Sequence, residues 1–192
     1  MFGEGTIINR QDTERLSLSL QGKEPFGLKM KGECVDRIFK NGVLIEERVG
    51  HNLVVTSFLN LITYMLKNSS GGIGYWAVGS GVSSWDSNMP DPVSSATSLT
   101  NEIGRAAISP NDIVFLNVSG VSTESPTNIL QVKHTFGTNE CNGTWREFGI
   151  FGGNATATAD SGIMMNKRHH AVLTKTSDMT VERVINFTLS LT

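Results

Sequence analysis

Four carboxylates are the first candidates for chemistry in this sequence. Asp86, Asp91, Glu102 and Glu147 lie in stretches with few other charged residues. Two carboxylates brought together in space can act as the acid and the base of a glycosidase. Their sequence spacing does not pair any two of them, so no catalytic residue is assigned and we expect the chain not to be an enzyme.

Glu147 is the most unusual of these carboxylates because it lies in an apolar stretch, TWREFGIFGG, over residues 144–153. Apolar side chains occupy both faces of this stretch, which is typical of a strand that is covered on both sides. A carboxylate in such a strand has to be solvated or paired. The adjacent Arg146 points to the other face, so we expect a more distant cation or backbone N–H groups to bind Glu147.

Motifs for a metal site or an activated nucleophile do not occur in the sequence. His169 and His170 are adjacent, so a strand would direct them to opposite faces, and no HExxH motif or Cys/His cluster accompanies them. The Gly-x-Ser runs lie in turns without a nucleophile-elbow context. Cys34 and Cys141 are far apart, which favours two reduced thiols over a bridge. We therefore expect no metal and no cofactor.

Aromatic residues offer a different chemistry, the stacking of a sugar ring. Tyr75, Trp76 and Trp85 can stack on a carbohydrate, with Asp86 and Asn88 binding its hydroxyl groups. Tyr75 and Trp76 belong to an apolar strand pattern, however, and are better interpreted as core residues. Trp85 and Asp86 then remain as the candidate contact for a glycan or a protein partner.

The elements that position these residues are expected to be mostly strands, because apolar and polar residues alternate between turn-rich segments. The clearest local prediction is a hairpin over residues 34–49, where Asn41-Gly42 suits the positive φ values of a type I′ turn. No strand–helix–strand rhythm occurs, which favours an antiparallel β-sandwich. Further strands are predicted at 73–79, 103–107, 113–118, 129–136, 144–153, 162–165 and 181–191.

One amphipathic helix is expected at about residues 56–67. Its apolar positions recur at helical spacing on one face, and we expect that face to cover the core of the sandwich. These positions are Phe58, Leu61, Ile62, Met65 and Leu66.

Residues 1–30 are expected to form an extended N-terminal arm with a short strand, and residues 31–192 the β-sandwich domain. Leu16, Leu18 and Leu20 alternate with serines and so predict a strand with one apolar side. Such a segment can add a strand to a neighbouring molecule or form an edge strand of its own domain.

The composition fits a folded chain of 192 residues, since 39% of them are hydrophobic. The net charge of −2 and the pI of about 6.1 give no indication of nucleic-acid binding. No signal peptide is evident, and the longest apolar stretch, 53–66, is too short to span a membrane, so we expect synthesis in the cytoplasm.

Charge is unevenly distributed along the chain. Residues 1–50 hold eight Lys or Arg and eight Asp or Glu, whereas residues 51–130 hold two and five. So few charges are unusual for a solvated surface. The distribution therefore favours contacts between subunits over a free monomer.

Five motifs resemble a group of bacteriophage virion proteins that are mostly associated with tails and tail fibres. Together they cover about residues 32–192, and the N-terminal segment falls outside the resemblance. In chain order they are KNG leading to HNLVV (40–55), AVGSG leading to Trp85-Asp86 (77–86), LTNEIGR (99–105), WREFGIFG (145–152) and SGIMMN (161–166).

The resemblance implies a non-enzymatic structural role in a phage particle and supplies no catalytic residues. It implies contacts with copies of this chain and with other virion proteins, in the virion after synthesis in the host bacterial cytoplasm. A place at the tail tip, baseplate or fibres is favoured over decoration of the capsid. A host-surface carbohydrate-binding module is the alternative from another class. No nucleic-acid or membrane partner is expected.

Overall fold

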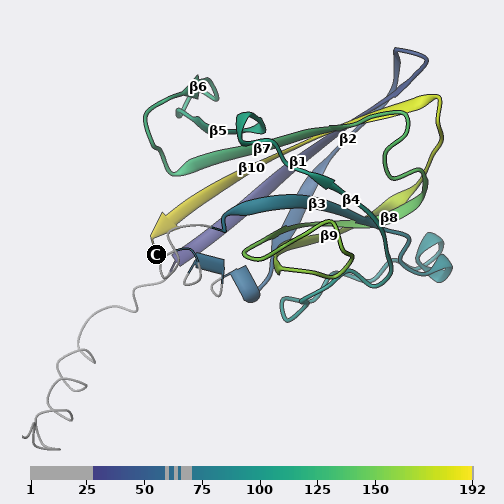
Figure 1. Ribbon diagram of the computed structural model, residues 1–192, viewed down its shortest axis with the longest axis horizontal. Coiled ribbons are helices and arrows are strands. Elements are labelled where there is room, and N and C mark those ends of the chain that lie inside the picture. Colours follow the sequence, from purple (N-terminus) through teal and green to yellow (C-terminus); the bar gives the residue numbers. More distant parts are fainter. Residues whose placement is uncertain (1–27, 59–60, 63–64, 66–70, 192) are drawn as a thin grey trace, which may run out of the picture. The chain divides into compact units, whose positions relative to one another are not determined.

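The structure, a computed structural model, describes residues 28–58, 61–62, 65 and 71–191. Residues 30–189 form one compact unit, to which the following description applies. It is built almost entirely of strands (Figure 1). In chain order these are β1 (Leu28–Lys40), β2 (Val43–Val54), β3 (Ile73–Gly79), β4 (Glu102–Ala107), β5 (Ile113–Leu116), β6 (Ser122–Thr123), β7 (Ile129–Phe136), β8 (Gly143–Gly152), β9 (Ile163–Lys175) and β10 (Met179–Leu191), with two 3-10 turns, η1 (Ser83–Asp86) and η2 (Pro110–Asp112).

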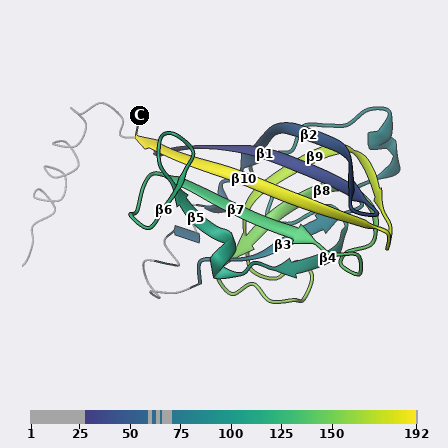
Figure 2. The ribbon, with the colours of Figure 1, turned by 90° about the horizontal axis from the view of Figure 1, so that it is seen from above.

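The strands form one continuous sheet in the order β4-β3-β8-β9-β2-β1-β10-β7-β5-β6. The sheet curls into a half-barrel, which is visible when the unit is seen from above (Figure 2). Strand β2 connects the two halves, because it pairs antiparallel with β1 along its length and with β9 at Leu53 and Val54. The mainly antiparallel β prediction is confirmed. The sandwich is not, since β2 joins what would be two separate sheets.

The predicted hairpin and several predicted strands are present. Asn41 and Gly42 have φ values of 49° and 77°, as a type I′ turn requires. Strands β3 and β7 have the predicted bounds, and β4 begins at Glu102. Strand β9 is much longer than the predicted run at 162–165, because the five polar residues at 166–170 interrupt its apolar pattern.

The helix predicted at 56–67 lies only partly within the described residues. Ser57, Phe58, Leu61, Ile62 and Met65 have helical geometry, and Phe58 and Leu61 are buried in the core. The remaining residues of that prediction lie outside the described part of the chain, so the amphipathic helix is not confirmed. The predicted arm over residues 1–30 also lies outside it, except for its last three residues.

Strand β8, the apolar stretch singled out in the sequence, is covered on both faces as expected. Trp145 and Phe148 belong to the larger hydrophobic cluster, whereas Phe151 belongs to a second cluster with Leu99. A register shift between Trp145 and Glu147 interrupts the simple alternation along β8. Trp145 and Phe148 therefore share a cluster, although strict alternation would place them on opposite faces.

A buried ion pair lies in the larger cluster. Arg183 of β10 donates two hydrogen bonds to Asp36 of β1, at 2.6 and 2.9 Å, and the two side chains are 0% and 2% exposed. The guanidinium also lies 3.8 Å from the centroid of the Phe148 ring. Burial opposes ionisation of Asp36, but the charge and hydrogen bonds of Arg183 hold the pKa of this carboxyl below its ordinary value.

Two further titratable groups lie beside this pair. Burial and the positive charge of Arg183 lower the pKa of His170 to about 3, so its imidazole is neutral. Burial and the negative charge of Asp36 raise the pKa of the Cys34 thiol to about 12. Both Cys34 and Cys141 are free thiols, as the sequence predicted.

Removing one partner of the Asp36–Arg183 pair leaves the other charge buried without compensation. We expect Asp36→Leu or Arg183→Met to lower the free energy of unfolding by roughly 3–5 kcal/mol each. The double variant should lose clearly less than the sum, because neither charge remains in the core. Urea denaturation measures all three values. Strict additivity of the two single effects would contradict the prediction. The control is Lys40→Met, which breaks the exposed pair with Asp178 and should lower the free energy of unfolding by less than about 1 kcal/mol.

The neutral His170 predicts that folding weakens in mild acid. The unfolded chain protonates this imidazole below about pH 6.5, whereas the folded chain does so only near pH 3. The stabilisation is therefore complete above the unfolded pKa and is lost as the pH falls through this window, by up to about 1.4 kcal/mol per pH unit. Burial also lowers the pKa of His169, which acts in the same direction.

Urea denaturation from about pH 7 to about pH 4.5 measures this slope. The His170→Gln variant should have a shallower dependence of the unfolding free energy on pH. The exposed His51 offers the control, and His51→Gln should keep the original slope. An unchanged slope in His170→Gln would show that this imidazole is not held neutral by the fold.

Candidate functional site

Glu147 of β8 is fully buried and has three partners from distant parts of the chain. Its Oε1 accepts hydrogen bonds from the backbone N–H groups of Thr100 (2.8 Å) and Asn101 (3.0 Å). The Nζ atom of Lys167, on β9, lies 3.0 Å from Oε2. The prediction that backbone N–H groups or a distant cation bind this carboxylate is confirmed in both of its forms.

These contacts fix the segment that precedes β4 on the sheet. Lys167 also donates to the carbonyl oxygen of Ser98 (3.3 Å) and to Oγ1 of Thr100 (3.2 Å). Gly79 of β3 packs directly on Glu147, since a Cβ at this position would lie 2.7 Å from Cγ of the glutamate. Every partner of the Glu147 carboxylate is thus a group of the protein itself. The arrangement holds the loop on the sheet and does not expose a free carboxylic acid.

The two residues proposed to contact a glycan, Trp85 and Asp86, lie in η1 and both have partners within the chain. The Trp85 ring stacks on the His169 imidazole with a centroid distance of 4.1 Å. Arg146 donates two hydrogen bonds of 2.7 Å to Asp86, and these bonds lower the pKa of the carboxyl. A hollow of about 310 Å³ lies beside them, lined by Trp85, Asp86, Ser87, Met89, Ala171 and Val172. Their role as a glycan or partner contact stays a prediction.

The other carboxylates also have separate positions. Glu102 pairs with Arg105 on β4 and accepts from the backbone N–H of Asp160 at 3.1 Å. Arg105 in turn donates to the carbonyl oxygens of Ser161 (2.8 Å) and Thr156 (3.2 Å). This pair holds the loop that follows β8. Asp91 is exposed.

The remaining sequence candidates lie in the core or on the surface. Trp76 is fully buried, in agreement with its interpretation as a core residue, and Tyr75 is half-buried on the same strand. Asn88 is exposed. Within the described residues no group of three or more His, Cys, Asp or Glu side chains can hold a metal ion. No helix in this part of the chain is long and apolar enough to cross a membrane.

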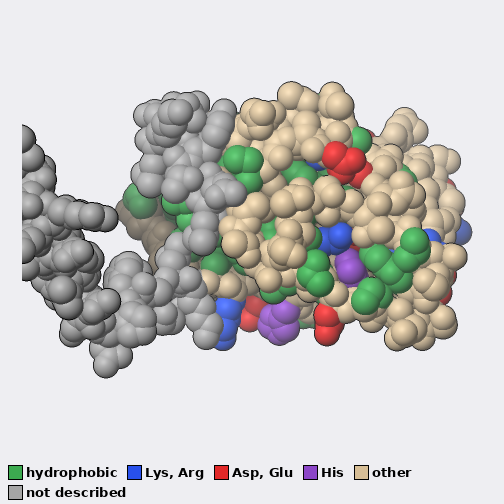
Figure 3. All heavy atoms as spheres, turned by 90° about the horizontal axis from the view of Figure 1, so that it is seen from below, with side chains coloured by type: hydrophobic (Ala, Val, Ile, Leu, Met, Phe, Trp, Pro, Cys, Tyr) green, Lys and Arg blue, Asp and Glu red, His purple; other side chains and the backbone are tan. Residues whose placement is uncertain are grey.

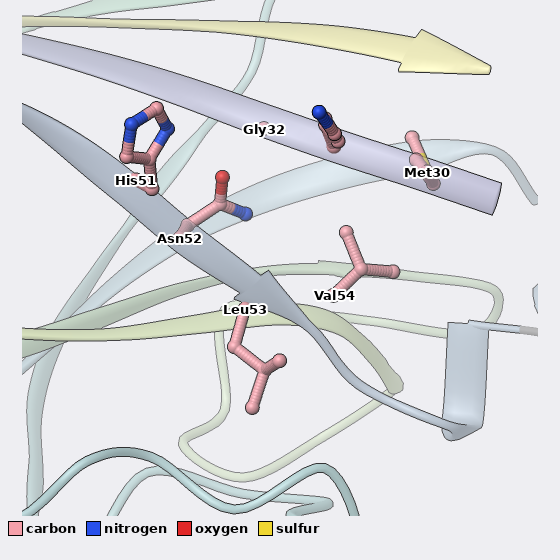
Figure 4. A pocket seen from close by; sticks show the side chains of 7 residues that line it. Met30, Gly32, His51, Asn52, Leu53 and Val54 are labelled. Carbon is pink, nitrogen blue, oxygen red and sulfur yellow. The ribbon is translucent and has the colours of Figure 1, made fainter. Parts of the chain in front are cut away.

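A second hollow, of about 380 Å³, lies where the start of β1 faces the end of β2 (Figure 4). Asn52 points toward Gly32 across the two strands, and a Cβ at Gly32 would lie 1.8 Å from the Asn52 amide oxygen. A larger residue at Gly32 would therefore require the Asn52 amide to move. The hollow contains His51 and Lys31 but no carboxylate, so it does not have an acid–base pair.

The surface feature that the sequence reasoning missed is the tip of the β1–β2 hairpin. Val43, Leu44, Ile45 and Val49 are 65%, 48%, 53% and 70% exposed. Figure 1 shows this tip projecting beyond the neighbouring strands. The run Val-Leu-Ile directly after a two-residue turn could have indicated this exposed surface, because residues at the tip of a projecting hairpin cannot reach the core. We define these four residues as the apolar tip.

Charged side chains are few on the face shown in Figure 3, which looks at the molecule from below the view of Figure 1. Three of the charges between residues 51 and 130, Asp86, Glu102 and Arg105, are paired within the chain. Among the described residues of this part of the sequence, the surface therefore carries few unpaired charges, and it also exposes apolar residues such as Val93 and Val118.

The Glu147 network predicts a specific local effect. Glu147→Gln keeps the shape of the side chain but removes the charge beside Lys167, so the free energy of unfolding should fall by roughly 3–5 kcal/mol. Hydrogen exchange at the amides of Thr100 and Asn101 should accelerate, because their acceptor is weakened. The exposed Glu46→Gln is the matched control and should leave both amides unchanged. Normal protection of these amides in Glu147→Gln would contradict the assignment.

No protein-family model matches this chain, and no curated protein is significantly similar to it.

Proposed function

We propose that this chain is a non-enzymatic structural component of a bacteriophage particle, which acts through contacts with copies of itself and with other virion proteins. The observation that carries the assembly part of this proposal is the apolar tip. Val43, Leu44 and Ile45 are exposed directly after the turn, and Val49 is exposed four residues further along the same strand. Clustered exposed apolar side chains mark surfaces that a partner covers.

The residues of the phage-like motifs support a structural role by what they do in the fold. Gly79, Asp86, Thr100 and Glu147 come from three of the five motifs, and all of them hold the long loop between β3 and β4 on the sheet. In a fourth motif, KNG forms the turn at the apolar tip. The residues of these motifs thus fit a rigid scaffold that carries an exposed hairpin.

The resemblance favours a place at the tail tip or baseplate, or with tail fibres, over decoration of the head.

The helical residues between Ser57 and Met65 fit an amphipathic helix at 56–67, with Phe58 and Leu61 on its buried side. Such a helix would cover part of the core and leave the hairpin free for contacts.

Light scattering of the full-length protein over a range of concentrations tests self-assembly. We expect a defined oligomer, and a shift toward monomer when charges replace the apolar tip in Leu44→Lys/Ile45→Lys. Val118→Lys is the control, because Val118 is 95% exposed on the turn between β5 and β6 and lies outside the tip. A wild-type monomer at all concentrations would overturn the self-assembly part.

Immunogold labelling of purified particles tests the virion part. Label is expected at one end of the tail, whereas label on the head would favour decoration. Unlabelled particles that are nevertheless intact would overturn the proposal.

The carbohydrate-binding alternative has one favourable observation, the hollow beside Trp85. It predicts glycan-array binding that is lost in Trp85→Ala while the fold is kept. The stacking of Trp85 on His169 argues against it, because that contact occupies part of the ring. The structural role is therefore the proposal that we retain.

A further inference from the structure

The edge of β2 beside the apolar tip has no strand partner in the described part of the chain. From Val43 to Asn52, β2 pairs only with β1, and its ladder with β9 is limited to Leu53 and Val54. The five residues from Val43 to Glu47 are all exposed. An edge of this kind presents unpaired backbone N–H and C=O groups, to which another strand can add.

We infer that this edge receives residues 16–20 of a second copy of the chain as an added strand. The inference rests on the proposed self-assembly and names the segment that makes the contact. The sequence of that segment, Leu-Ser-Leu-Ser-Leu, predicts a strand of five residues with one apolar and one small polar side. Its length matches the five exposed residues of the edge.

The two faces of the hairpin match the two sides of this segment. On the outer face, the cross-strand pairs Phe39–Leu44 and Val35–Val49 are apolar, and the ion pair Arg37–Glu47 lies between them. The inner face near the edge carries Glu46, whose carboxylate bonds Arg48. An added strand with leucines on the outer side would place a leucine beside Leu44, and its serines would lie beside the polar groups of the inner face.

Chain length assigns the segment to another copy. Glu47 pairs with Arg37, which is nine residues and so about 30 Å along β1 from Leu28. The added strand would also lie about 10 Å sideways from β1, beyond β2. Residues 20 and 28 are eight residues apart, which allows at most about 29 Å. At full extension this reach falls just short of the copy's own Glu47, which favours a second copy as the source of the segment.

Charge favours this segment over a second β2 strand as the partner. Antiparallel pairing of two β2 edges would bring Glu46 and Glu47 of both copies close together, and like charges in cross-strand positions are destabilising. Residues 16–20 carry no charge. The exchange of such a segment between copies can link them into a ring or an open chain.

Cysteine cross-linking in the full-length chain tests the inference. Copies with Ser17→Cys or Ser19→Cys and one affinity tag are mixed with copies carrying Glu46→Cys and another tag, and the mixture is oxidised. We expect a covalent heterodimer to be the main cross-linked product for at least one of the two serine positions. The native thiols contribute little background, because burial raises the pKa of Cys34 to about 12 and that of Cys141 to about 11.

Two controls make the result specific. Val118→Cys replaces Glu46→Cys at an exposed position outside the tip and should give at least fivefold less heterodimer. Leu18→Asp, which places a charge on the apolar side, should abolish the product, whereas Gln21→Asp, beyond the leucine run, should retain it.

The outcomes separate the two proposals. A defined oligomer with heterodimer at or below the Val118→Cys level overturns the arm contact and leaves self-assembly standing. Cross-linking within one chain that carries both cysteines, without heterodimer, overturns exchange between copies. A monomer with no heterodimer overturns both proposals.

Discussion

Glu147 is buried beneath the loop that connects β3 to β4, and this carboxylate determines how that side of the sheet is covered. A buried carboxylate is tolerated only with hydrogen bonds and a compensating charge. The backbone N–H groups of Thr100 and Asn101 supply the first, and Lys167 the second. Because these groups precede β4, the loop has to return to the sheet at this point. Its return brings Leu99 into the smaller hydrophobic cluster.

The strands β1 and β10 depend on a second buried pair, Asp36–Arg183. Strand β9 contributes residues both to the surroundings of this pair and to the Glu147 network. Asp36 and Arg183 join β1 to β10, so the hairpin and the last strand are held together inside the core. Adjacent residues of β9 then face different environments. His169 stacks on Trp85 of the loop, whereas His170 lies beside Asp36 and Arg183 and is kept neutral. The sequence predicted this division from their adjacency alone.

The sequence predicted those features that depend on neighbouring residues. Alternation predicted β7, the Asn-Gly pair predicted the β1–β2 turn, and the apolar surroundings of Glu147 predicted the kind of partner it needs. The identity of that partner, Lys167, depends on the register between β8 and β9, which no local pattern contains. The continuous sheet depends on two residues at the end of β2, Leu53 and Val54, pairing with a strand more than a hundred residues away. Tertiary context decides such contacts, and a sandwich and a curled sheet have the same alternation.

A curled sheet that does not close into a full barrel has edge strands. In this sheet the edges differ in how they are protected from pairing with other strands. Edge strand β4 is flanked by residues 156–161, whose backbone bonds Arg105 and Glu102. The opposite edge strand, β6, has only two residues, and very short edges resist further pairing. The Val43–Glu47 edge is neither flanked nor very short among the described residues, and it exposes apolar side chains. It carries a bulge at Ile45 and the charges of Glu46 and Glu47, which limit unspecific pairing with other strands. The strand addition proposed above would use the backbone groups that this edge leaves unpaired.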